Sequence, residues 1–233
     1  NNRLNRVEEL SVNQDFNSLI INSLKECCDI SRVISRVSGK KTNPREILSL
    51  SSSLGILDYL EEEVDKNSIK SIYKLINKKK SLYTLKKNIN DTLMPDCPVN
   101  FSKGNFIKDG VDTVLDEYRK ISKDATEWLL NYQSDIERKT NISKVKVGYN
   151  RVFGYYIEIS NANLNKVPDY FIRKQTLTNA ERFFTEELKD YENKILSAEE
   201  KIIEIELNIL NNLIELIIKN MKSISINADI ISK

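Results

Sequence analysis

The sequence predicts a mainly α protein: a helical body with two long antiparallel helices that carry a small antiparallel β-sheet at their tip. Over most of the 233 residues, apolar side chains recur every three or four positions, which is the period of an α-helix. Between two long stretches of this kind the period changes to two, which is typical of strands. The composition, 40% hydrophobic and 30% charged, is that of an ordered, charge-rich chain.

Short helices are predicted for the first hundred residues. Asn43-Pro44-Arg45-Glu46 is a helix start, because Asn caps the first turn, Pro fits the first helical position and Glu can bond back to the cap. Weaker helices are predicted over 68–78 and 81–92. The segment 94–104 contains two prolines and a glycine, and it is predicted to be a loop.

Two longer helices follow, each with one apolar seam. The first extends from Asp109 to about Thr140, roughly 48 Å at 1.5 Å per residue. The second begins after the capping residue Thr185 and reaches about Asn220, roughly 54 Å. Packing of one helix on the other is sufficient to explain the seams. The predicted seam residues are Val111, Val114, Tyr118, Ile121, Ala125, Trp128 and Tyr132 in the first helix, and Ile195, Ala198, Ile202, Ile205, Ile209 and Leu216, with polar Asn212, in the second.

Strands are predicted between these helices. Residues 144–147 and 155–159 alternate, with a hairpin turn at 150–154 between them. Two further strands are predicted over 171–177 and 182–184. Because an isolated small sheet is marginally stable in water, the ends of the two helices are expected to support it.

Most catalytic chemistry is excluded by composition. The chain has no histidine, so a histidine-dependent triad or metal site cannot form within it. Cys27, Cys28 and Cys97 are too few and too irregularly spaced for a zinc cage. No phosphate-binding G-x-x-x-x-G-K-[ST] loop is present, and no apolar run reaches the length of a membrane span.

The charge of the chain is unevenly distributed. The net charge is +2, but residues 138–182 contain nine basic and three acidic side chains, a net charge of +6. The remainder of the chain therefore carries −4. Such a basic segment is typical of a module that binds polyanions.

Three blocks of this basic segment and its flanks resemble the MutS family of DNA mismatch repair proteins. They are the stretch from Val145 to Ile159, the stretch from Tyr170 to Phe183, and Glu187-Leu188-Lys189-Asp190-Tyr191 with the residues that follow. The resemblance implies a helical lever (core) domain over 1–125 and 186–233, interrupted by a clamp domain over 126–185. It also implies that the chain, which begins without Met, is part of a longer protein.

The resemblance implies a function in holding double-stranded DNA by its backbone, with the lever connecting the clamp to an ATPase domain. These residues are then not an enzyme and bind no cofactor, because ATP and Mg²⁺ belong to the P-loop domain of full-length members. Full-length members are expected to form homodimers, to recruit a MutL-type repair partner, and to work without a membrane in the bacterial cytoplasm, at the nucleoid when bound to DNA.

Contacts with the DNA backbone are expected from cations and amides on turns at the tip. One position departs from the family pattern Leu-Lys-Asn, which is Leu177-Thr178-Asn179 here, so the lysine contact is missing. Arg173 and Lys174 are adjacent on a strand and should face opposite sides. The predicted contact residues are Asn150, Arg151, Arg173, Lys174, Gln175, Thr176, Asn179 and Arg182.

Other interpretations stay open at the level of sequence. The chain could be a helical protein-interaction module with an incidental basic tip, or a MutS homologue that works in recombination. Arg182 beside Glu181 is also consistent with a structural ion pair. The aromatic residues of the basic segment could stack on bases, but a small sheet needs large side chains for its own core.

Overall fold

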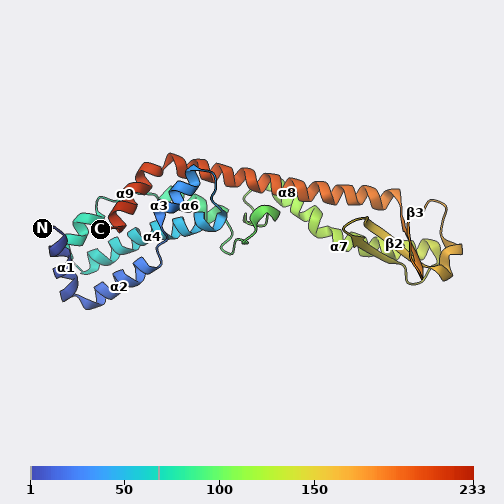
Figure 1. The fold of residues 1–233 in the computed structure, drawn as a ribbon, viewed down its shortest axis with the longest axis horizontal. Helices are drawn as coiled ribbons and strands as arrows, with labels where there is room; N and C mark the ends of the chain where they lie inside the picture. The colour runs from blue at the N-terminus through green and yellow to red at the C-terminus, as the bar shows by residue number, and fades with distance from the viewer. Residues whose placement is uncertain (1, 68) are drawn as a thin grey trace. The chain divides into compact units, whose positions relative to one another are not determined.

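The computed structural model describes residues 2–67 and 69–233, and it is mainly helical with one four-stranded antiparallel sheet in that part of the chain (Figure 1). The chain divides into two compact units. Unit 1 comprises residues 1–111 and 205–233, and unit 2 comprises residues 112–204. Unit 2 is longer at both ends than the segment 126–185 that the resemblance implies for a clamp, because it includes the helical support of the sheet. Ser68, at the start of the helix predicted over 68–78, lies outside the described residues.

Unit 1 is built of helices that pack around α4. Its elements are α1 (Asn2–Val12), α2 (Gln14–Lys25), α3 (Ile30–Ser38), α4 (Pro44–Asn67), α5 (Lys70–Ile76), α6 (Tyr83–Thr92), the 3₁₀ turn η1 (Phe101–Lys103), the C-terminal part of α8 (Glu186–Lys219) and α9 (Met221–Ile231). Helices α2, α3, α5, α6 and α9 all contact α4. The predicted start of α4 is confirmed, since Asn43 Oδ1 accepts from the Glu46 N–H at 2.9 Å and Glu46 Oε2 accepts from the Asn43 N–H at 3.3 Å.

The predicted loop after α6 is held in unit 1 by a buried carboxylate. The loop returns to α6 through a bridge between Leu93 and Ile107, and Phe106 and Ile107 are completely buried. Glu206, on α8, is 0% exposed, and its Oε2 accepts from the backbone N–H of Phe106 at 3.0 Å. Gly104 adopts φ +76° beside this carboxylate, a conformation that a residue with a Cβ rarely takes.

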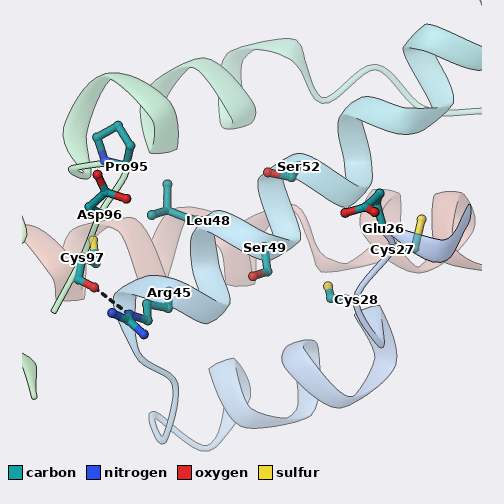
Figure 2. Close-up of a pocket in the computed structure, with 10 residues that line it drawn as sticks. All are labelled: Glu26, Cys27, Cys28, Arg45, Leu48, Ser49, Ser52, Pro95, Asp96 and Cys97. Carbon is teal, nitrogen blue, oxygen red and sulfur yellow. Dashed lines mark hydrogen bonds between the residues drawn. The ribbon is translucent and has the colours of Figure 1, made fainter. Parts of the chain in front are cut away.

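All three cysteines line one polar pocket of unit 1 (Figure 2). Arg45 Nε donates to the carbonyl of Cys97 at 2.6 Å across this pocket, and burial raises the pKa of the Cys27 and Cys97 thiols. The thiols are therefore protonated near neutral pH. Within the part of the chain that the structure describes, no three His, Cys, Asp or Glu side chains are grouped so as to hold a metal ion.

Unit 2 consists of a sheet supported by two helices. The elements are α7 (Thr113–Thr140), β1 (Lys146–Asn150), β2 (Gly154–Ser160), the 3₁₀ segment η2 (Asn161–Lys166), β3 (Ile172–Thr176), β4 (Ala180–Phe184) and the N-terminal part of α8. The strand order is β1-β2-β4-β3. The predicted hairpin is confirmed, with Asn150 paired to Gly154 at its end.

One face of the sheet packs on α7 and forms the core of unit 2. This inner face carries Ile157, Ile159 and Phe183, which are buried with Tyr132 and Ile136 of α7. Strand β1 runs back along α7, since Gln133 Oε1 accepts from the Val147 N–H and Glu137 Oε1 accepts from the Val145 N–H. These side chains cover the edge of the sheet that would otherwise be open to another strand.

The α7 helix and the start of α8 are antiparallel within unit 2, as predicted. Tyr132 shares a hydrogen bond with Thr185, while Trp128, one turn earlier on α7, stacks on Tyr191 at a centroid distance of 3.5 Å. As the residue number increases along α7, the residue number of the contact partner in α8 decreases, so the two helices run in opposite directions. Thr185 is the cap of α8, because its Oγ1 accepts from the Leu188 N–H at 3.1 Å.

The seam predictions are partly wrong. Val111 and Val114 are exposed, and Leu115 is the buried residue at the start of α7. On α8, Ile195 and Ala198 are buried as predicted. Beyond them the buried residues lie one position later than predicted, for example at Leu210 and Ile217. The polar residue among them is Glu206, whereas Asn212 is exposed. The strict spacing of three and four residues drifts on a helix of 3.6 residues per turn, so the buried stripe shifts where the packing partner changes.

The buried phenol of Tyr132 makes unit 2 less stable at alkaline pH. Burial raises the pKa of Tyr132 to about 12, above the usual 10, so the folded state holds its phenol proton more tightly than the unfolded state. This contribution is complete below pH ~10 and is lost as the pH rises toward ~12, a change of about 2–3 kcal/mol. We expect Tyr132→Phe to lower the free energy of unfolding by about 1 kcal/mol at pH 9. This difference from wild type should shrink above pH 10 and reverse in sign by about pH 11, because only wild type loses the contribution of the phenol.

Urea unfolding followed by circular dichroism measures this difference. The matched control is Tyr118→Phe, which removes a phenol from the same helix at a half-buried position. If the difference in unfolding free energy between wild type and Tyr132→Phe stayed constant up to pH 11.5, the raised pKa of Tyr132 would be contradicted.

Candidate nucleic-acid interface

The outer face of the sheet, opposite α7, is polar and is crossed by a network centred on Arg182. Its guanidinium donates from Nε to Glu158 at 2.9 Å and from Nη1 to Gln175 at 3.0 Å, and it lies 4.0 Å over the ring of Tyr156. Arg182 pairs with Glu158 across the strands, and not with its neighbour Glu181. Two of the predicted contact residues, Arg182 and Gln175, therefore bond to each other and maintain the sheet.

The Tyr156 ring beneath Arg182 covers a glycine. A Cβ built on Gly148 would lie 2.7 Å from Tyr156 Oη, so the ring occupies the space that any other residue at 148 would need. Tyr156 is only 7% exposed, with Gly148 on one side and Arg182 on the other. Its ring is thus not available to stack on a base.

Arg173 and Lys174 separate as predicted, but both have internal contacts. Arg173 Nε lies 2.8 Å from Glu181 Oε2, in a pair whose Glu181 side chain is almost fully buried. A register shift follows between Arg173 and Gln175, and Lys174 Nζ donates to the Tyr155 carbonyl at 3.3 Å and lies over the ring of Phe184. Arg173 remains exposed, whereas Lys174 is half-buried.

The first hairpin turn lies beside α8. Asn150 Oδ1 accepts from the backbone N–H groups of Val152 and Phe153 and so shapes this turn, in which Arg151 is exposed. Gly154, with φ +72°, faces Glu192, whose Oε1 is 1.9 Å from the position of a Cβ on Gly154. Asn150 and Arg151 therefore lie in the predicted hairpin of the sheet, at its end near the second turn of α8.

Thr176 and Asn179 lie at the opposite end of the sheet. Strand β2 has seven residues, so its two ends are about 20 Å apart. The turn between β3 and β4 is attached to the start of η2, because the Asn161 N–H donates to the Asn179 carbonyl and Asn161 Nδ2 donates to the Thr178 carbonyl. Of the eight predicted residues, Arg151, Arg173, Thr176 and Asn179 are exposed, and all of these except Arg173 form no side-chain bond with a described residue.

The end surface of unit 2 combines this turn with exposed cations that were not predicted as contacts. We use that name for the last turn of α7, residues 141–145, η2 and the β3–β4 turn. The end of η2 is attached to residue 141, because Lys166 Nζ donates to the Asn141 carbonyl at 3.3 Å, and its start is attached to the β3–β4 turn through Asn161. The cations of this surface are Arg138, Lys139, Lys144 and Lys166, all exposed, and Arg138 pairs with Asp135 at 2.7 Å. Lys144 and Lys166 belong to the basic segment, but sequence reasoning missed them because nothing local indicates that they lie beside Asn179.

A second pair of missed cations lies along the outer face. Lys146 is exposed on β1 and pairs across the strands with Glu158. Lys189, in the first turn of α8, lies 5.9 Å from the Phe184 ring that Lys174 also approaches. Such side chains can add long-range attraction for a polyanion without direct contact.

Most aromatic residues of the basic segment serve the sheet. Phe171 packs on Phe183 at a centroid distance of 6.0 Å, and Tyr155 lies at 5.0 Å from Tyr149. Tyr149 and Tyr170 remain about half exposed at 53% and 55%. Core packing is thus the main role of this group, as the size of the sheet predicted.

Comparison with known proteins identifies the family. Residues 110–201 match the model of MutS family domain IV. The chain is 40% identical to the DNA mismatch repair protein MutS of Clostridium novyi over 99% of its residues, and 38% and 40% identical to the proteins of the same name from Bacteroides fragilis and Bacteroides thetaiotaomicron over all of its residues. The chain spans about a quarter of the length of these relatives, 26% or 27%.

The matched domain coincides closely with unit 2, which holds the sheet and its two helices. In the described residues, no helix is long and apolar enough to cross a membrane. The likeness to proteins of one name extends over the helices of unit 1 as well as over domain IV. This chain therefore belongs to the MutS family, and its residues 110–201 form a MutS family domain IV.

Proposed function

We propose that this part of a MutS-family protein holds duplex DNA by its phosphate backbone, through the end surface of unit 2. The observation that carries the proposal is that η2 connects exposed cations to an exposed amide. Its end bonds to Asn141 through Lys166, near Lys144, and its start bonds to the turn that carries Asn179. Cations and amides on turns are the usual ligands of DNA phosphates, and they read no sequence. Lys144 and Lys166 supply positive charge at the end where Thr178 replaces the family lysine.

The charge within unit 2 favours binding at this end. Residues 141–185 have seven basic and three acidic side chains, a net charge of +4. The helical segments 112–140 and 186–204 have net charges of −2 and −4, from five basic against seven acidic and three basic against seven acidic side chains. DNA is repelled by most of the helical surface and attracted to the sheet and its end, so charge orients the encounter.

The activities of the whole protein are part of the same proposal. The residues of this chain act as the binding arm and not as an enzyme, while ATP and Mg²⁺ bind elsewhere in the longer protein. The α8 helix is a single element of 34 residues, which suits a lever between the clamp and an ATPase. Homodimer formation, recruitment of a MutL-type partner and a location at the bacterial nucleoid are expected for the whole protein.

Mismatch repair is favoured over the two alternatives. The relatives reported above are all named DNA mismatch repair proteins, which favours that role over recombination. A helical protein-interaction module would not need exposed cations and amides at one end of its sheet. Its basic tip would then bind DNA weakly and without dependence on particular residues.

The double variant Lys144→Glu/Lys166→Glu tests the proposal. We expect the 233-residue chain to bind short duplexes weakly, with an affinity that falls steeply between about 50 and 200 mM salt. The double variant should weaken binding equally for matched, mismatched and unrelated sequences, and it should lower the slope of log K against log salt by about 2. Fluorescence anisotropy of labelled duplexes measures both quantities.

Lys120→Glu/Lys123→Glu is the matched control. It makes the same change of charge on the exposed face of α7 in the same unit, away from the end surface. An equal loss in both double variants would indicate attraction by net charge alone. The protein-interaction alternative would be supported if the folded chain bound no duplex even at low salt.

A further inference from the structure

A pocket of unit 1 is lined by more basic than acidic side chains. Helices α1 and α5 line it, with a volume of about 630 Å³. Its cations are Arg6, Lys70, Lys74 and Lys78, and its only lining acid is Glu9, which leaves a net charge of +3. Domain IV does not include these residues, so the pocket is separate from the interface proposed above.

The single carboxylate of the pocket is already engaged. Glu9 Oε2 accepts from both the backbone N–H and the hydroxyl of Ser71, at 3.0 and 2.7 Å. These bonds attach α1 to the start of α5, and they hold the pKa of Glu9 below its usual value, with smaller effects from Lys70 and Lys74. The carboxylate is therefore committed to a structural contact, and one anion does not neutralise four cations.

The lysines of the pocket differ from their neighbours in the chain. Lys79 pairs with Asp58 and Glu61, and Lys86 pairs with Asp58. Lys70, Lys74 and Lys78 are exposed, and none of them forms an ion pair with an acid in the described residues. Like charges four residues apart repel each other and destabilise a helix. These three lysines therefore repel one another and, unlike Lys79 and Lys86, are not neutralised by an ion pair with Asp58 or Glu61.

The shape and chemistry of the pocket suit a compact anion. A concave site of this volume is within the range of small-molecule pockets. Asn5 and Asn77 add amide groups beside the ammonium groups, and Tyr73 is 42% exposed at the pocket. Ammonium groups bind phosphate as point charges, and several together favour an anion with more than one charged phosphate. A duplex, being convex and wide, does not enter such a hollow.

We propose that this pocket binds a compact polyphosphate, either free pyrophosphate or the phosphate chain of a nucleotide. Titration calorimetry of the 233-residue chain at low ionic strength, with pyrophosphate as the probe, is the test. We expect saturable binding with one site per chain. Lys70→Gln/Lys74→Gln should weaken it at least about tenfold, because two charge-assisted contacts are lost.

Two further variants make the test specific. Lys87→Gln/Lys219→Gln removes two exposed lysines from other helices of unit 1 that form no ion pair with a described residue, and it should change the affinity by less than about twofold. Glu9→Gln keeps an acceptor for Ser71 but removes the negative charge, so it should tighten pyrophosphate binding. A misfolded variant would not bind more tightly, so this opposite sign separates a site from a loss of structure.

The proposal is overturned if wild type shows no saturable binding, or if both lysine pairs cause the same loss. It is also overturned if a short duplex competes with pyrophosphate and depends on Lys70 and Lys74 to the same degree, since the patch would then be a nucleic-acid surface. Titration with a nucleoside triphosphate distinguishes the two sources. Tighter binding than pyrophosphate indicates a nucleotide, and equal binding indicates the phosphate chain alone.

Discussion

Replacing Gly148 by Val should destabilise unit 2 by about 2–4 kcal/mol. The new side chain needs the space that the Tyr156 ring occupies, since even a Cβ would lie 2.7 Å from Tyr156 Oη. Tyr156 would have to leave its place under Arg182, and the bonds from Arg182 to Glu158 and Gln175 would be disturbed with it. Urea unfolding followed by the fluorescence of Trp128, the single tryptophan and a residue of unit 2, measures the loss.

Lys146→Val is the matched control for this prediction. Lys146 lies on the same strand and the same face, two residues before Gly148, but its side chain is exposed. Because Val favours strands, the change should be neutral or slightly stabilising, within about 0.5 kcal/mol. Similar losses in the two variants would mean that any β-branched residue on this face is harmful, and that the space above Gly148 is not the cause.

Glu206→Ala should destabilise unit 1 by about 3 kcal/mol. The change leaves the buried N–H of Phe106 without the carboxylate that accepts from it, and it opens a cavity beside α8. Glu206→Gln should cost less, because an amide oxygen can still accept this hydrogen bond. Thermal unfolding and hydrogen exchange at the Phe106 amide measure the two effects, and the exchange should be fastest in the Ala variant.

Glu204→Ala controls for the loss of a glutamate from the same helix. Glu204 is largely exposed and pairs with Lys201 at the surface, so its removal should change the free energy of unfolding by about 0.5 kcal/mol or less. Equal effects of the two alanine variants would show that helix propensity or net charge decides the outcome, and the anchoring role of Glu206 would have to be abandoned.

The type of each element was predictable because it depends on neighbouring residues. The start of α4 at Asn43-Pro44-Arg45-Glu46, the cap at Thr185 and the hairpin between Asn150 and Gly154 all follow from local chemistry, and the structure confirms them. The burial of Glu206 was not predictable. From sequence alone, a glutamate next to an apolar stripe is expected to be exposed. Glu206 is buried because it accepts a hydrogen bond from the Phe106 amide, which lies a hundred residues earlier in the chain.

The candidate interface divides in the same way. The basic segment 138–182 is visible from charge alone, and its cations do lie on the sheet and its end surface. Which of them are available to DNA depends on cross-strand partners. Arg182 is engaged by Glu158 and Gln175, and Arg173 is engaged by Glu181, because strand pairing brings these residues together from distant positions. Contact with DNA by the eight predicted residues stays a prediction.

The sequence by itself determined the mainly α class, the small antiparallel sheet, the basic segment and the likeness to the MutS family, since periodicity, capping and charge are properties of short stretches. Only the tertiary structure decided that the first hairpin turn lies beside Glu192, that Lys144 and Lys166 share a surface with Asn179, and that four cations of α1 and α5 line one pocket. These relations depend on register and packing between segments far apart in the chain. No local pattern records them, because their energy appears only when the distant segments meet.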